Sequence, residues 1–507
     1  MSNRSPEPAA ITLDRALDTE LVREIVLQEL ARHVDDYLFA QRWFGDKDRP
    51  IMEIVLGDVA VESVAGGWFV LATAIVGFED FSEASDYLVL AAVVPETGTW
   101  TDDSLVRITT PVAAWQVVDI AAAPGFPAWW LSRFAAEAEL ASVWGRYRWR
   151  RLPGFEAAAR EAGPGTFVLG GMGQSNTTVR YGEAMFGKIF RRLREGINPD
   201  EEISRFLAER TTFRQLPMPY GTATYQAGGG GIYPVGVLFK FIPSVGEGWG
   251  WTQDFLATVP LASYAAAARR LGERTAQLHL ALSSVETEPD FAPEPVTEAD
   301  ISYWEHTTAA GVRAICEDLR VRRRDLSPRM QSLVMAMLDN KAELLDRVAG
   351  FRALTGTVKT RVHGDFHLGQ LLRTPDDDWV LLDFEGEPAR TIEQRRAKTS
   401  PMKDVADMLH SFTYARGMAA RSADADHARL AMWEREARAA FLAGYRGEVA
   451  TSPLALIPVG DAEIERAVVA WALAKSLYQV RYELGNRPDW LDVSLTPLVP
   501  RMEQPSR

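Results

Sequence analysis

The sequence predicts an α+β protein with a β-rich N-terminal cap, a β-sheet lobe and a mostly helical C-terminal lobe. Two observations favour this class. Apolar runs rich in β-branched and aromatic residues fill the first half of the chain, for example residues 68–76 and 86–94, and such runs are typical of strands. Beyond residue 245, long helical segments dominate instead, for example residues 259–283 and 328–350.

Composition limits the class of protein. The 507 residues suffice for about two to four domains. The net charge of −14 disfavours nucleic acid as a partner, because phosphate binding requires a basic surface. A single cysteine, Cys316, excludes internal disulfides and suits a reducing compartment. We find neither an apolar signal region nor a run long enough to span a membrane, so we expect a cytoplasmic protein.

The first two segments are expected to form an N-terminal cap and a connecting subdomain. Residues 1–118 should form a tail and a cap, with disorder over residues 1–20, a helix from about Glu20 to Phe39, and a small sheet over residues 51–118. Residues 119–165 carry Pro, Ala and Gly and a cluster of Trp and Arg, and are expected to form a connecting subdomain.

Residues 166–245 are expected to form a five-stranded lobe that ends in a hinge, and residues 246–507 the helical lobe. A turn at residues 170–177 offers small residues, backbone N–H groups and hydroxyls to phosphates, although it is no Walker motif and is equally compatible with an ordinary hairpin. A helix begins near Asn198, where a proline and early acidic residues suit a helix N-terminus. The strand at 235–242 enters the hinge and places Phe239 at the nucleotide.

Lys188 lies in the apolar strand that follows the turn. Burying a lysine is unfavourable unless its charge is paired. Pairing to the phosphates of ATP and to a helix carboxylate, for which we choose Glu202, would supply that partner. The other interpretation is that Lys188 extends from an edge strand into solvent.

The most informative stretch covers residues 361–388. It places Asp365 five residues before Gln370, and Asp383 after the next apolar run. Phosphoryl transfer from ATP requires a carboxylate that orients the attacking hydroxyl and oxygen ligands for Mg²⁺. The spacing is typical of the catalytic loop of protein kinases, with Gln370 where asparagine is usual, and Asp383-Phe384 matches the start of their metal-binding Asp-Phe-Gly. The stretch therefore predicts a protein-kinase-like enzyme that uses ATP and Mg²⁺.

Asp404 opens a helix after a loop. A simple helix cap is one interpretation. In kinase-like folds a buried aspartate at this place holds the backbone of the catalytic loop, so we expect Asp404 to position that loop.

Two different classes of protein stay open as interpretations. The first is a hydrolase whose metal is held by His363, Asp365, His367 and Asp383. It leaves Lys188 and the glycine-rich turn unexplained. The second is a catalytically inactive nucleotide-binding or scaffold protein, against which the joint presence of Asp365, Asp383 and Lys188 argues.

Taken together, these motifs resemble the bacterial maltokinases, a branch of the aminoglycoside-phosphotransferase-like kinases. The similarity extends over nearly the whole chain and is carried by residues 42–49, 174–177, 188–193, 198–202, 271–279, 363–370, 383–388 and 475–490. It implies ATP-dependent phosphorylation of maltose to maltose 1-phosphate, which feeds α-glucan (glycogen) biosynthesis from trehalose. It also implies a bilobal monomer with an extra cap, and an association with a trehalose-isomerising enzyme.

The resemblance also assigns roles to residues. Asp365 would orient the anomeric hydroxyl, while Gln370 and Asp383 hold Mg²⁺. The nucleotide would lie against Gln174, Ser175, Asn176, Thr177, Lys188, Glu202 and Phe239. The sugar site would be lined by His363, Lys475, Tyr478, Arg481 and Tyr482. Lys475 and Tyr478 are three residues apart, so one helix face presents both.

A related group with the same fold phosphorylates glucosamine, and the catalytic stretch does not distinguish the two acceptors. An amino-sugar site should supply extra carboxylates near the acceptor, whereas Lys475 favours a neutral sugar. We therefore expect maltose as the acceptor, with glucosamine as the alternative.

Overall fold

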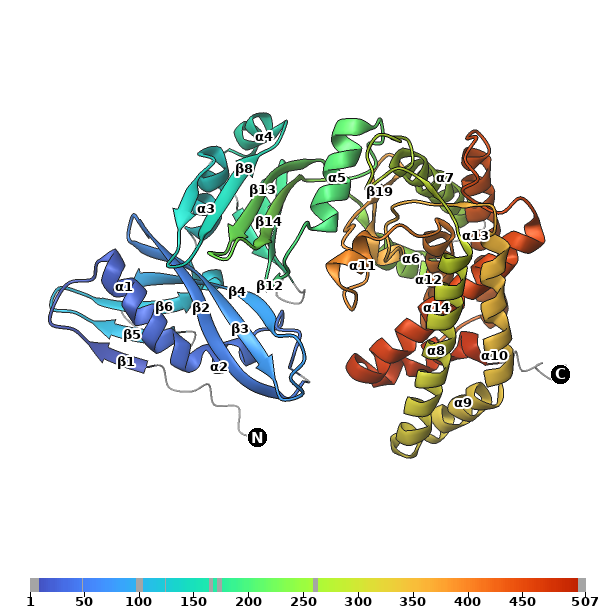
Figure 1. The fold of residues 1–507 in the computed structure, drawn as a ribbon, viewed down its shortest axis with the longest axis horizontal. Helices are drawn as coiled ribbons and strands as arrows, with labels where there is room; N and C mark the ends of the chain where they lie inside the picture. Colours follow the sequence, from blue (N-terminus) through green and yellow to red (C-terminus); the bar gives the residue numbers. More distant parts are fainter. Residues whose placement is uncertain are drawn as a thin grey trace. The chain divides into compact units, whose positions relative to one another are not determined.

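The computed structural model describes residues 9–47, 49–96, 104–123, 125–163, 167–170, 176–258 and 263–499. The chain divides into two compact units, residues 1–202 with 218–241 and residues 203–217 with 242–507. The first unit is built around two β-sheets, and the second is mostly helical (Figure 1). The α+β class expected from the sequence is confirmed.

The cap sheet has seven strands, six of which follow the order β1-β5-β6-β4-β3-β2, while β12 pairs with β4. The strands are β1 (Ala9–Thr12), β2 (Ile51–Val64), β3 (Gly67–Phe78), β4 (Ser85–Pro95), β5 (Ser104–Thr109), β6 (Ala114–Asp119) and β12 (Arg192–Leu193). The expected disorder over residues 1–20 is wrong from residue 9 onward, because β1 pairs in parallel with β5. Residues 1–8 lie outside the described residues.

One helical segment covers a face of the cap sheet (Figure 1). It consists of α1 (Thr19–Ile25), a π-helical turn (Val26–Leu30) and α2 (Ala31–Ala40). Leu30 and Leu38 are fully buried in a core shared with Val70 of β3 and Val89 of β4. The helix expected near residues 20–39 is therefore present, and burial of its apolar face against the sheet stabilises it.

The second sheet has the order β7-β8-β13-β14-β11-β10-β9. Its strands are β7 (Glu139–Ala141), β8 (Arg146–Arg151), β9 (Phe167–Gly170), β10 (Asn176–Tyr181), β11 (Met185–Phe190), β13 (Pro219–Gln226) and β14 (Ile232–Lys240), and the unit also carries α3 (Phe126–Ala135), α4 (Phe155–Ala162) and the start of α5 (Pro199–Arg210).

The Trp/Arg cluster belongs to this second sheet and not to a separate connecting subdomain. Strand β8 pairs with β13 along its whole length. Tyr147 and Trp149 are fully buried, whereas the arginines that alternate with them are half-buried or exposed. That two-residue alternation is the pattern of a strand with one buried face. Because β7 and β8 share a sheet with strands after residue 165, the boundary expected at residue 165 falls within one sheet.

The helical unit contains α6 (Gly248–Thr258), α7 (Tyr264–Leu282), α8 (Glu298–Arg322), α9 (Pro328–Asp339), α10 (Lys341–Arg347), α11 (Ile392–Arg396), α12 (Met402–Ala419), α13 (His427–Val449), α14 (Asp461–Asn486) and α15 (Leu491–Leu495). Short strands β15 (Gly246–Glu247), β18 (Leu371–Arg373) and β19 (Trp379–Leu381) form one small sheet, and β16 (Glu294–Pro295) pairs with β17 (Val358–Lys359). No helix in the described part of the chain is long and apolar enough to cross a membrane.

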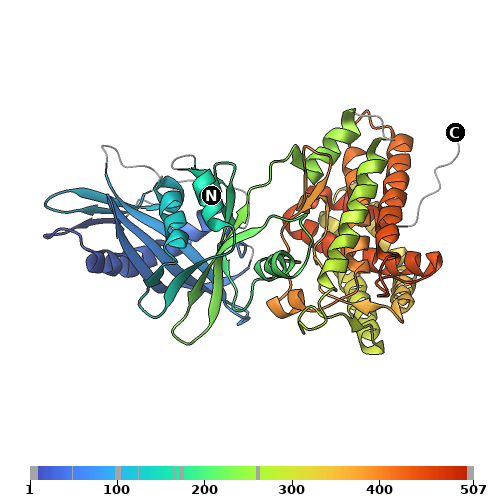
Figure 2. The ribbon, with the colours of Figure 1, turned by 90° about the horizontal axis from the view of Figure 1, so that it is seen from above.

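Helices α7 and α13 lie side by side in this unit (Figures 1 and 2). Two glycines make the close approach possible. A Cβ atom on Gly272 would lie 2.0 Å from the carbonyl oxygen of Phe441, and one on Gly444 would lie 2.1 Å from that of Arg269. His279 of α7 lies between Tyr445 of α13 and Asp404 of α12, and bonds both.

Candidate active site

The catalytic loop at residues 363–370 is anchored by Asp404, in the first turn of α12. The fully buried Asp404 carboxylate accepts the backbone N–H groups of His363, at 2.7 Å, and Gly364, at 2.9 Å. It also bonds His279 Nε2 at 3.0 Å. Gly364 has a φ of 85°, a left-handed conformation that favours glycine. The expected contact of Asp404 with the loop backbone is thus present.

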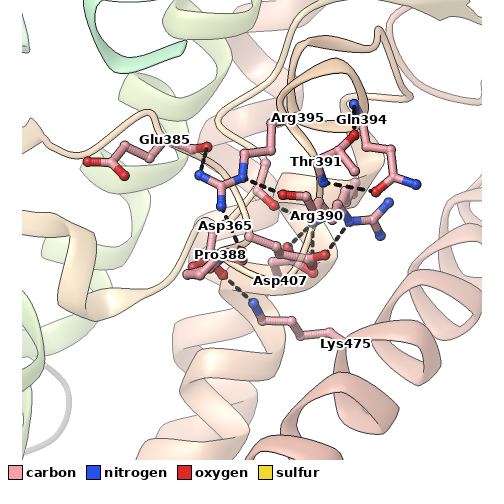
Figure 3. Close-up of polar contacts among 12 residues, drawn as sticks. Asp365, Glu385, Pro388, Arg390, Thr391, Gln394, Arg395, Asp407 and Lys475 are labelled. Atoms are coloured by element: carbon pink, nitrogen blue, oxygen red, sulfur yellow. Dashed lines mark hydrogen bonds and ion pairs between the residues drawn. The ribbon is translucent and has the colours of Figure 1, made fainter. Parts of the chain in front are cut away.

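Asp365 projects from this loop toward Lys475 of α14 (Figure 3). Lys475 Nζ donates to Asp365 Oδ1 at 2.6 Å, and His367 Nε2 lies 3.9 Å from Asp365 Oδ2. Burial alone would raise the pKa of Asp365, but the Lys475 ammonium outweighs it and holds that pKa well below its usual range. Burial lowers the pKa of His367 to about 4. At neutral pH, Asp365 is therefore an anion beside a cation and a neutral imidazole.

Three further buried charges surround this pair. Lys403 Nζ donates to Gly364 O at 2.6 Å, to Asp407 Oδ2 at 2.8 Å and to Glu387 Oε1 at 3.1 Å. Burial raises the pKa of Asp407 to about 6 against the opposing effect of Lys403. For Glu387 burial is outweighed, chiefly by Lys403, and the pKa falls to about 2. Sequence reasoning missed these three residues, although Lys403 precedes Asp404 directly.

Gln370 and Asp383, the two residues expected to hold Mg²⁺, lie close together. Gln370 Nε2 donates to Asp383 Oδ2 at 3.3 Å. A carboxylate oxygen of Glu385, which the sequence did not single out, lies within 4.8 Å of one from Asp383. Carboxylate and amide oxygens are the hard donors that Mg²⁺ prefers, so the chemistry of this set fits a magnesium ion.

The segment after Asp383 is braced by Arg395 (Figure 3). The Arg395 guanidinium donates to the carbonyl oxygens of Pro388 at 2.7 Å, Arg390 at 3.0 Å and Glu385 at 3.4 Å. Asp383 itself has a φ of 63°, which aspartate tolerates better than most residues. These contacts fix the backbone that presents the two acidic side chains.

His363, which was expected at the sugar site, is not among the described lining residues of the cavity beside Lys475. Its side chain is fully buried between the rings of Phe366 and Phe384, at centroid distances of 5.1 Å and 5.0 Å. His363 Nε2 bonds the carbonyl oxygen of Leu382 at 2.8 Å. His363 therefore ties the catalytic loop to the strand end that precedes Asp383.

A cavity of about 310 Å³ opens beside Lys475 and His367. Helices α6, α12 and α14 and the chain after α14 supply much of its wall, with the side chains of Trp249, Asp407, His410, Tyr414, Gln479, Arg487 and Trp490. Trp249 and Tyr414 contact each other with ring centroids 5.7 Å apart. Aromatic rings with interspersed hydrogen-bonding groups suit a ligand with apolar faces and hydroxyl edges.

The sugar residues expected on α14 only partly line this cavity. Lys475 lines it, and its ammonium lies 5.1 Å from the centroid of the half-buried Tyr478 ring. Arg481 and Tyr482 are exposed and are not among the lining residues that the structure describes. The helical period explains the position of Arg481, which is six residues from Lys475 and therefore lies on another face of α14. Tyr482, seven residues on, shares the face of Lys475 and Gln479 but lies about two turns further along the helix.

In the first unit, Lys188 of β11 forms an ion pair with a carboxylate of α5. The partner shown is Asp200, whose Oδ2 lies 3.0 Å from Lys188 Nζ, two residues before the expected Glu202. Asn198 sets this register, because its Oδ1 accepts the N–H groups of Asp200 and Glu201. The Lys188 side chain is 13% exposed, which excludes an extension into solvent.

The remaining nucleotide residues are described only in part. Gln174 and Ser175 lie outside the described residues. Thr177 Oγ1 accepts a hydrogen bond from Arg191 Nε at 2.8 Å, and Asn176 is half-buried at the start of β10. Phe239 is buried on β14 in a small apolar cluster with Phe190 and Val237. Contacts of these residues with ATP stay predictions.

Comparisons with known proteins show the family and the fold of the chain. The profile of the phosphotransferase enzyme family matches residues 167–445. The chain is 28% identical to the glucosamine kinase of Streptacidiphilus jiangxiensis over 364 residues, which is 69% of this chain and 76% of that protein. It is 30% identical to the glucosamine kinase of Mycolicibacterium smegmatis over 337 residues, 63% of this chain and 75% of that protein.

The same fold occurs among solved structures. A structure described as glucosamine kinase in complex with glucosamine, ADP and inorganic phosphate matches with a TM-score of 0.61 at 21% identity, covering 90% of this chain and 95% of that chain. A second crystal form of glucosamine kinase matches with a TM-score of 0.62 at 22% identity over the same shares. At this identity the likeness is one of fold.

Proposed function

Because the chain belongs to the phosphotransferase enzyme family, we propose that it is an ATP-dependent sugar kinase that phosphorylates maltose to maltose 1-phosphate. One observation carries the proposal. The anionic Asp365 is held by Lys475, and Lys475 also lines a cavity walled by aromatic and hydrogen-bonding side chains. A sugar hydroxyl that enters this cavity would meet a carboxylate held in place for it.

The low pKa of Asp365 indicates how the carboxylate acts. A weak base does not remove a proton ahead of phosphoryl transfer. Asp365 instead accepts the hydrogen bond of the acceptor hydroxyl, aims its oxygen, and receives the proton as the phosphoryl group arrives. Such positioning accounts for much of the catalysis of phosphoryl transfer, whose transition state is loose.

Two further groups serve the phosphates in this proposal. Gln370, Asp383 and Glu385 would hold a magnesium ion, which when bound neutralises phosphate charge. Lys188, kept charged and oriented by Asp200, would contact the phosphates of ATP. No covalent intermediate with the protein is needed.

The charges around the cavity favour a neutral sugar. The two carboxylates among its described lining residues are already engaged. Asp407 is paired with Lys403, and Glu247 accepts the N–H groups of Trp249 and Gly250 at the start of α6. A bound ammonium would need a carboxylate of its own to offset its desolvation.

Glucosamine is the second candidate acceptor, and the names of the two relatives support it. Asp407 is then the residue that would receive the amino group, because its carboxylate lines the cavity. The two candidates therefore differ in whether Asp407 keeps Lys403 as its partner.

An acceptor screen tests the proposal. Maltose, glucosamine, glucose and trehalose are each incubated with ATP and Mg²⁺, kcat/KM is measured from ADP release, and the phosphate position is determined by ³¹P NMR. We expect the highest kcat/KM with maltose and a phosphate on the anomeric carbon. A higher value with glucosamine would select the second candidate, and ADP release with none of the four would contradict both.

A further inference from the structure

A second cavity, of about 340 Å³, lies in the first unit, far along the chain from the catalytic stretch. Residues from both sheets of that unit line it. Its polar and aromatic lining residues are Asp58, Thr73, Asp86, Trp144, Tyr225 and Tyr233. The proposed kinase reaction uses none of them.

Trp144 is presented to this cavity on a rigid turn. Its side chain is 71% exposed, although it sits in the turn between β7 and β8. Asp58, which is 4% exposed, fixes that turn by accepting the Trp144 N–H at 2.9 Å and the Ser142 hydroxyl at 2.5 Å. The β13–β14 hairpin packs behind it so closely that a Cβ on Gly228 would lie 2.2 Å from the Trp144 carbonyl oxygen.

Two tyrosines continue the aromatic wall. The rings of Tyr225 and Tyr233 lie with centroids 5.9 Å apart and planes tilted by 37°. The Tyr225 hydroxyl donates to Asp58 Oδ2 at 2.7 Å, so this ring is held by the same carboxylate that holds the turn. Asp58 thus organises the aromatic set and is itself saturated with hydrogen bonds.

Asp86 is the second acidic residue that lines the cavity. In the described part of the chain, no hydrogen bond or ion pair reaches its carboxylate, which lines the cavity from β4. Burial, followed by the charges of Glu83 and Glu195, raises the pKa of Asp86. No lysine or arginine is among the described lining residues. The cavity therefore has a negative charge that lacks a partner.

We propose that this cavity binds a small organic cation, such as an alkylammonium. Aromatic faces attract a cation that lies over them, and ammonium groups are recognised by sets of such rings. Asp86 supplies the opposite charge, and Trp144, Tyr225 and Tyr233 supply the rings. A neutral sugar would gain less, because it would leave the charge of Asp86 unpaired, and an anion would be repelled.

Isothermal titration calorimetry of the full chain with choline and with putrescine tests this assignment. We expect saturable binding of at least one of the two. Asp86→Asn and Trp144→Ala should each weaken binding by about tenfold or more, the loss typical of one charge-assisted or cation–π contact in a partly buried site.

Matched controls separate the cavity from general surface effects. Glu79→Gln removes one exposed acidic charge, and Phe81→Ala removes an aromatic side chain that is 85% exposed elsewhere on the cap. Both should bind like the unaltered protein, and circular dichroism checks that all four variants fold. Absence of binding by both cations at 10 mM (about the weakest affinity of interest) would overturn the assignment. Unchanged binding by Asp86→Asn, or maltose binding that Trp144→Ala abolishes, would also overturn it.

Discussion

Each unit of the protein contains a buried lysine that is paired with an aspartate at the proposed site, and the two members of the pair are proposed to have opposite roles in the two units. In the first unit, Lys188 lies 3.0 Å from Asp200; in the second, Lys475 lies 2.6 Å from Asp365. In the first pair the lysine is proposed to contact substrate and the aspartate holds it. In the second pair the aspartate faces the substrate and the lysine holds it.

The surroundings explain why the roles are exchanged. Lys188 is paired with Asp200 in the first turn of α5, and the N-terminus of a helix favours anions such as phosphate. Asp365 shares its surroundings with Lys475, Lys403, Asp407 and Glu387, and the ammonium of Lys475 holds its pKa low. The comparison teaches that a buried ion pair does not by itself reveal which member acts; the neighbouring charges do.

Asp365→Asn should have the largest effect, because the neutral amide can still accept a hydrogen bond from the hydroxyl but cannot receive its proton. We expect kcat to fall by about 10²–10⁴-fold with little change in the binding of ATP or sugar, measured by steady-state kinetics and calorimetry. Asp377→Asn is a matched control, since that side chain is 91% exposed. Near-normal kcat would remove Asp365 from the catalytic role.

Lys188→Ala should come next. Loss of a cation aimed at the phosphates should lower kcat/KM for ATP by about 10²-fold, while KM for the sugar changes little. Asp200→Asn keeps the lysine but loosens its position, so a smaller loss in the same parameter is expected. If Asp200→Asn were the more damaging of the two, the division of roles in this pair would be reversed.

Lys475→Met should change the pH dependence of the reaction, because Lys475 lowers the pKa of Asp365. Without the ammonium, the effect of burial on the pKa of Asp365 is opposed by fewer charges, so that pKa rises and less of the active carboxylate is present as the pH falls. The acid limb of the profile of kcat/KM against pH should therefore move to higher pH, by about one unit or more. Lys475→Arg should largely restore the position of the limb. A uniform loss with an unchanged limb would mean that Lys475 only contacts the sugar.

The parts of this site that were predictable share a short stretch of sequence. Asp365, Gln370 and Asp383 lie within one loop and the next strand end, so local spacing alone brings them together. The contact of Asp404 with the loop was predictable because kinase-like folds place a buried aspartate here, whereas its position at the start of a helix alone suggested a simple cap. The contact of Lys188 with Asp200 was not predicted, because three acidic residues follow one another in α5 and the register at the Asn198 cap is not evident from the sequence.

The cavity wall could not be predicted from spacing at all. Trp249, Tyr414 and Trp490 come from parts of the chain more than seventy residues apart, and only helix packing brings them to one place. Each is also an ordinary aromatic residue in its local context. The one available signal was the Asn-Arg-Pro-Asp-Trp segment at the end of the last motif, which contains Arg487 and Trp490.

Trp490→Ala should have the smallest effect on the kinetics, but it tests whether the sugar binds in the cavity beside Lys475. An aromatic ring that covers a sugar face binds ground state and transition state alike, so its loss should raise KM for the sugar by about tenfold and leave kcat and KM for ATP unchanged. Arg481→Ala is the control, because that exposed residue on α14 was expected at the sugar site but does not line the cavity. If Arg481→Ala raised KM for the sugar and Trp490→Ala did not, the acceptor would lie along the outer face of α14. In that case the assignment of this cavity to the sugar would have to be abandoned.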